Sequence, residues 1–62
     1  MNERHPEILE KLRGTGRTMR YLTDVLGLDY NRVVRWVNGY GPLSAGDVEL
    51  IVAQIEEWSV QG

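Results

Sequence analysis

Apolar residues recur at helical spacing in four short segments of the chain. The first segment follows Pro6, which suits the first turn of a helix, and the glycines of Gly14–Gly16 stop it, so the pattern predicts a helix over about residues 6–13. The second begins at Thr18, whose hydroxyl can cap it, and ends at Gly27, which predicts a helix over about 18–26. The apolar positions of these two helices are Ile8, Leu9, Leu12, Met19, Leu22, Val25 and Leu26.

The second half of the chain repeats this organisation. After a link of three residues, Gly27–Asp29, the Asp29 carboxylate can cap a third helix over about 30–38. Ser44 with Asp47 approximates a capping box for a fourth helix over about 45–58. Its apolar stripe consists of Val48, Ile51, Val52, Ile55 and Trp58. No strand alternation, internal repeat or low-complexity segment is present, so we expect an all-α fold, a compact bundle of four short helices in one domain over residues 1–62.

Composition narrows the chemistry that this small domain can support. The chain has 62 residues, no cysteine and one histidine, His5, so disulfides and thiolate metal sites are excluded and we expect no metal and no cofactor. Its apolar runs fall far short of the roughly 20 residues that span a bilayer, and no leader pattern is recognised, so we expect a soluble, cytoplasmic protein. The chain also lacks an activated serine motif, a phosphate-cradling loop after a strand and room for a deep pocket, which makes an enzyme the least favoured class.

Charge is segregated along the chain, although its net value is only −2 and the pI is about 5.2. Counting Lys and Arg against Asp and Glu gives −2 for residues 1–10, +4 for residues 11–35 and −4 from residue 44 onward. Because salt screens charges over about a nanometre, a partner responds to the local charge rather than to the total. The acidic pI therefore does not exclude a nucleic-acid face in the basic centre.

The third predicted helix carries a polar edge opposite an apolar one. At about 100° per residue, Asn31, Arg35 and Asn38 fall within about 60° of each other, with Arg32 on one flank. The opposite side carries Val33, Trp36 and Val37. Amide and guanidinium groups on an exposed helix edge are the chemistry that reads bases in a major groove, and a solvated helix face is the alternative interpretation.

The stretch "LTDVLGLDYNRVVRWVNG", Leu22–Gly39, resembles the helix-turn-helix of the Cro and lambda-repressor-like (XRE-type) class of small phage and bacterial regulators. The apolar, small, apolar, glycine, apolar and cap positions of that pattern correspond to Leu22, Thr23, Leu26, Gly27, Leu28 and Asp29, and the buried positions of its recognition helix to Val33 and Trp36. Two positions depart from the pattern. Thr23 stands where alanine is usual, and we expect its hydroxyl to bond back to the Met19 carbonyl. Met19 itself stands where a phosphate-binding glutamine is often found.

The resemblance implies roles for particular side chains. Tyr30, Asn31 and Arg35 would contact base edges, and Arg32 a base or a phosphate. Phosphate contacts would come from Arg17, Thr18, Arg20 and Asn38. Two alternatives stay open: Tyr30 can pack on the domain instead, and Arg20 can pair with Asp24 four residues on.

The function that this resemblance implies is sequence-specific binding of double-stranded DNA by a homodimeric repressor on a pseudo-palindromic operator, in a bacterial or phage-infected cell. We expect the dimer surface to include Leu50, Trp58 and Val60, with local packing of this C-terminal region as the alternative. The competing function is a protein-interaction module on the same fold, an inhibitor or antitoxin-like binder whose acidic surfaces meet a basic partner. Neither function needs a small-molecule substrate or a membrane.

Overall fold

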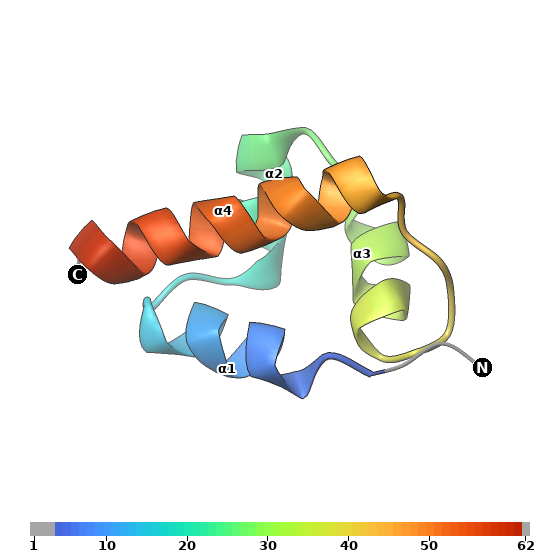
Figure 1. Cartoon of the computed structure of the whole chain (residues 1–62), viewed down its shortest axis with the longest axis horizontal. Helices are drawn as coiled ribbons and strands as arrows, with labels where there is room; N and C mark the ends of the chain where they lie inside the picture. The colour runs from blue at the N-terminus through green and yellow to red at the C-terminus, as the bar shows by residue number, and fades with distance from the viewer. Residues whose placement is uncertain (1–3, 62) are drawn as a thin grey trace.

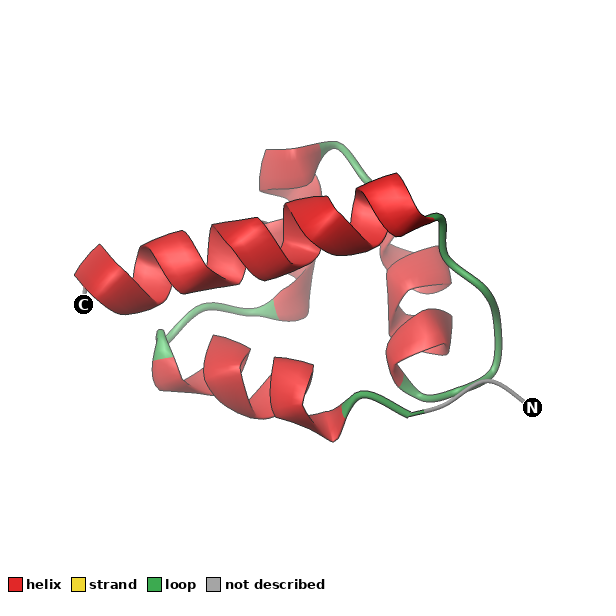
Figure 2. Ribbon diagram, in the orientation of Figure 1, coloured by secondary structure: helices red, strands yellow, loops and turns green. Residues whose placement is uncertain are grey.

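The computed structural model describes residues 4–61, which form four helices packed into a compact globule (Figures 1 and 2). The helices are α1 (Pro6–Gly14), α2 (Met19–Leu26), α3 (Tyr30–Val37) and α4 (Ala45–Gln61). The described part of the chain contains no strand, so the predicted all-α class is confirmed. The largest difference in length is at α4, which continues to Gln61. Among residues 4–61, no helix combines the length and the apolar character needed to cross a membrane.

Side chains cap the helices where the sequence predicts caps. The Thr18 hydroxyl accepts a hydrogen bond from the Tyr21 amide at 3.1 Å and so begins α2. At the start of α4, Ser44 Oγ accepts from the Asp47 amide at 3.2 Å, which is one half of the predicted capping box. Each bond satisfies an amide that has no partner within its own helix.

The core lies where the four helices meet, and it is entirely apolar apart from one threonine. Its buried side chains are Ile8, Leu12, Leu22, Val33, Trp36, Val37, Ile51, Ile55 and Trp58. Val25 and Val52 belong to the apolar stripes of their helices but are 48% and 37% exposed, so neither lies in the core. In α2 the packed face includes Thr23, which is 1% exposed, and Val25 lies away from that face.

Thr23 reaches a different carbonyl from the one expected. Its Oγ1 donates to the carbonyl oxygen of Arg20 at 3.0 Å, not to that of Met19, so the predicted partner is wrong by one residue. The hydroxyl is nevertheless satisfied inside α2, which removes the cost of burying it at a close helix contact.

The link between α2 and α3 is the three-residue turn that the sequence predicts. Gly27 ends α2 in the left-handed conformation with φ +70°, and the Leu28 amide donates to the Thr23 carbonyl at 2.9 Å. This is the usual glycine termination of a helix, in which a residue without a Cβ adopts positive φ at little cost.

Two glycine substitutions should therefore change stability in opposite directions. A Cβ added at Gly27 or at Gly46 meets no atom within 4 Å, so the backbone alone decides the effect. We expect Gly27→Ala to lower the free energy of unfolding by about 1 kcal/mol, because φ is positive there. Gly46→Ala, inside α4, should raise it by about 0.5 kcal/mol. Urea unfolding followed by circular dichroism measures both, and a stabilised Gly27→Ala protein would contradict the left-handed turn.

The segment before α1 is attached to the end of α3. The His5 amide donates to the Val37 carbonyl at 2.9 Å, and the His5 ring stacks on Trp36 with 4.2 Å between ring centroids. His5 Nδ1 also lies 3.6 Å from Glu7 Oε1. These contacts support the C-terminal end of α3 from the side opposite its polar edge.

Candidate nucleic-acid interface

Helix α3 has one buried and one exposed face, as its sequence predicts. Val33, Trp36 and Val37 are at most 7% exposed and pack in the core. Asn31, Arg32 and Arg35 are exposed on the other side. A helix of eight residues anchored by three buried side chains holds its polar edge in a fixed orientation relative to the domain.

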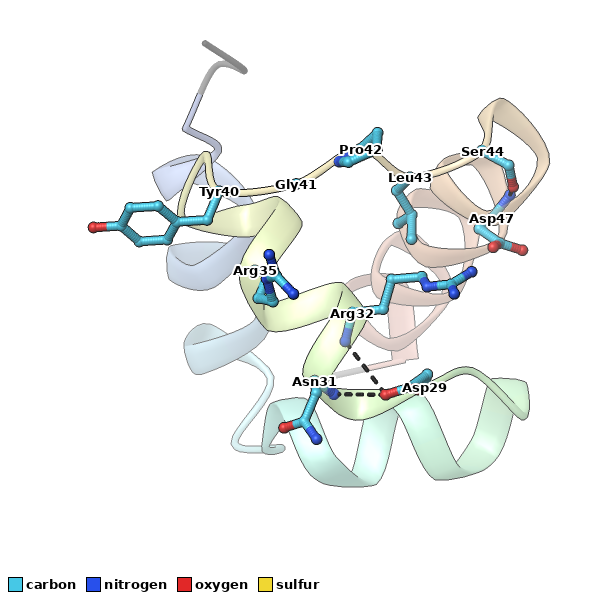
Figure 3. Close-up of a pocket in the computed structure, with 10 residues that line it drawn as sticks. All are labelled: Asp29, Asn31, Arg32, Arg35, Tyr40, Gly41, Pro42, Leu43, Ser44 and Asp47. Atoms are coloured by element: carbon cyan, nitrogen blue, oxygen red, sulfur yellow. Dashed lines mark hydrogen bonds between the residues drawn. The ribbon is translucent and has the colours of Figure 1, made fainter.

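The polar edge of α3 forms one wall of an open groove of about 800 Å³ (Figure 3). The loop after α3 and the first turn of α4 form the other wall. The groove is lined by Asp29, Asn31, Arg32, Arg35, Tyr40, Gly41, Pro42, Leu43, Ser44 and Asp47. The structure thus brings three of the four predicted base-contacting residues into one concave surface and leaves Tyr30 outside it.

The Asp29 carboxylate fixes the start of α3 and leaves the neighbouring side chains free. Its Oδ1 accepts from the amides of Asn31 at 2.9 Å and Arg32 at 3.3 Å (Figure 3). Because the backbone amides of these two residues donate to Asp29, this acid acts as a helix cap, and Asn31 and Arg32 line the groove.

The loop that closes the groove contains an aromatic residue that sequence reasoning missed. Tyr40 is 71% exposed, lines the groove and extends outward from the loop (Figure 3). Its amide donates to the Arg35 carbonyl at 2.8 Å, and the preceding Gly39 has φ +83°, so the turn brings the Tyr40 backbone back to the last turn of α3. The sequence signal was present: a lone tyrosine stands between two glycines directly after the polar edge of α3.

Tyr30 and Arg20 contact each other across the junction of α2 and α3. The Arg20 guanidinium carbon lies 4.3 Å from the centroid of the Tyr30 ring, and Tyr30 is partly buried. Within residues 4–61 no ion pair joins Arg20 to Asp24, so that alternative is not realised. Tyr30, a predicted base contact, and Arg20, a predicted phosphate contact, therefore form a single cation–π pair beside the groove.

The other predicted phosphate contacts are already partly engaged. Arg17 donates to the Thr15 carbonyl at 3.2 Å and its guanidinium lies 4.7 Å from the centroid of Trp58. Asn38 follows the last residue of α3, and its side-chain amide donates to the Val34 carbonyl at 2.9 Å. Each keeps further donor hydrogens, since a guanidinium has five and an amide has two.

Trp58 belongs to the core of the domain and not to a partner surface. It is 7% exposed, stacks with Tyr21 at 5.6 Å between centroids and is covered by Arg17. The local-packing alternative therefore holds for Trp58, and its inclusion in the dimer surface is corrected. Leu50 and Val60 are 47% and 87% exposed and stay available to a partner.

The groove itself is close to electrically neutral. Two arginines, Arg32 and Arg35, face two acids, Asp29 and Asp47. Long-range attraction to a polyanion must then come from the basic residues around the groove rather than from its lining.

In comparisons with protein-family models, curated proteins and solved structures, nothing matches this chain.

Proposed function

We propose that α2 and α3 act as a helix-turn-helix and that the protein binds double-stranded DNA with sequence specificity. The observation that carries the proposal is the groove: Asn31, Arg32 and Arg35 line it on a helix whose other face is buried in the core. An exposed helix edge fits the major groove, which is about 12 Å wide.

The side chains divide into those that read bases and those that hold the backbone. The Asn31 amide has the donor and acceptor pair that matches adenine, and the Arg35 guanidinium matches guanine. Arg17, Thr18, Arg20 and Asn38 supply phosphate contacts that fix the register of the helix. Tyr40, at the open edge of the groove, adds an aromatic ring and a hydroxyl for a sugar or phosphate.

The protein would act as a homodimeric transcriptional repressor. Two copies would read half-sites about one helical turn apart, roughly 34 Å, on a pseudo-palindromic operator. Leu50 in the first half of α4 and Val60 near its C-terminal end, two exposed apolar side chains, are the candidate contacts between the copies.

Selection of bound duplexes from a random pool tests the function directly. We expect a palindromic consensus that the protein binds at least about 1,000-fold more tightly than a scrambled duplex. The logarithm of the affinity should fall with the logarithm of the salt concentration, by about 0.9 for each phosphate contacted. Equal affinity for both duplexes, or no dependence on salt, would refute the proposal.

A further inference from the structure

A second groove lies between α1 and α4, which run side by side in the same direction (Figure 1). It measures about 150 Å³, and its lining consists of Glu7, Ile8, Lys11, Val52, Ile55 and Glu56. It shares no residue with the groove along α3.

The floor of this second groove is where the core reaches the surface. Ile8 and Ile55 are core side chains, 8% and 2% exposed, and Val52 beside them is 37% exposed. An apolar floor between two parallel helix ridges is the shape into which the apolar face of a third helix packs.

The charged residues around the floor of the second groove favour a partner helix of opposite charge. The rim carries Glu7 and Glu56 against the single base Lys11. The excess of acid continues along α4, where the charged residues are Asp47, Glu49, Glu56 and Glu57 and none is basic. A second copy of this chain would bring the same acidic excess to the contact, so repulsion disfavours self-association here and complementarity favours a basic partner.

We propose that the groove between α1 and α4 binds a cationic amphipathic helix of a partner protein. The apolar stripe of that helix covers Ile8, Val52 and Ile55, and its lysines or arginines meet Glu7 and Glu56. Because the two grooves are separate, the partner and DNA bind at the same time, and this second activity stands whether or not the chain binds DNA.

A designed peptide with the chemistry of the proposed partner tests the surface. The probe is a labelled peptide of about four helical turns with leucines on one face and lysines elsewhere. Its control has the same composition with the leucines spread around the helix, so that charge is equal and only the apolar stripe is lost. Fluorescence anisotropy measures both affinities, and we expect the striped peptide to bind at least about tenfold more tightly.

Paired substitutions on α4 locate the binding site. Glu56→Lys should weaken the striped peptide about tenfold or more, whereas Glu57→Lys, the same charge change one position along, should have an effect of about twofold. Val52→Lys should weaken it similarly, and Ala53→Lys should not. All four positions are solvent-exposed on α4, and circular dichroism checks that each variant keeps its helices.

Three results would overturn the proposal: no binding of the striped peptide, equal binding of the two peptides, or equal losses from Glu56→Lys and Glu57→Lys. Sedimentation equilibrium supplies a fourth. A dimer of the protein alone that Val52→Lys dissociates would assign the groove to a second copy. The peptide results do not depend on DNA binding. Arg35→Ala alters only the groove along α3 and should keep full affinity for the peptide.

Discussion

Arg35→Ala is expected to cost about 1–3 kcal/mol of discrimination at one base pair of the selected operator. The wild-type protein should prefer one base at that position by about ten- to a hundredfold, and the variant should bind all four nearly equally. The physical reason is that a guanidinium makes two directed bonds to one base edge, which alanine cannot replace. Binding to duplexes substituted at each position measures the loss.

The fold should survive this change. The Arg35 side chain is exposed. Its Cβ is the atom nearest to a Cβ built at Gly41, at 3.8 Å, and alanine keeps that Cβ. Arg13→Ala is the matched control, since Arg13 is an exposed arginine of α1 that lies outside both grooves. It should weaken specific and scrambled duplexes alike. Loss of helix content in Arg35→Ala, or a uniform loss of affinity, would mean that Arg35 does not read a base.

Leu22→Ala should have the largest effect on stability, about 2–5 kcal/mol. Leu22 is 0% exposed and belongs to α2, which packs against both α3 and α4, so its truncation leaves a cavity at the centre of the core. A domain of 62 residues has a total stability of only about 3–9 kcal/mol. The substitution should therefore lower Tm by at least about 10 °C in thermal unfolding followed by circular dichroism.

Val25→Ala in the same helix separates burial from helix propensity. Val25 is 48% exposed, so its truncation removes little buried surface, and alanine is the better helix former. We expect its free energy of unfolding to stay within about 0.5 kcal/mol of the wild type. If Val25→Ala were as damaging as Leu22→Ala, the orientation of α2 described above would be wrong.

Local signals in the sequence were enough to predict where the helices lie. Thr18, Asp29 and Ser44 each accept the amide bonds that their positions indicate, because capping depends on neighbours within a few residues. Gly27 likewise ends α2 through its own backbone freedom. The polar edge of α3 followed from the same local geometry, since a helix of known phase places its residues around the axis without further information.

Features that depend on contacts between distant segments could not be predicted in this way. Whether Val25 or Thr23 faces the core is decided by how α2 meets its neighbours, and both fit an amphipathic helix of eight residues. Trp58 is buried because Tyr21 and Arg17, about forty residues earlier in the chain, cover it. Tyr40 joins the groove only because the loop turns back toward Arg35.

The attachment of His5 to the end of α3 has a practical consequence for measuring these interactions. Because the His5 amide and ring contact Val37 and Trp36, a group attached next to His5 lies close to the helix proposed to read DNA. The C-terminal end of α4 lies at the opposite end of the molecule from α3 (Figure 1). Immobilising the protein on a sensor surface beyond the end of α4 should therefore leave the α3 groove more accessible to a duplex than immobilising it at a position next to His5.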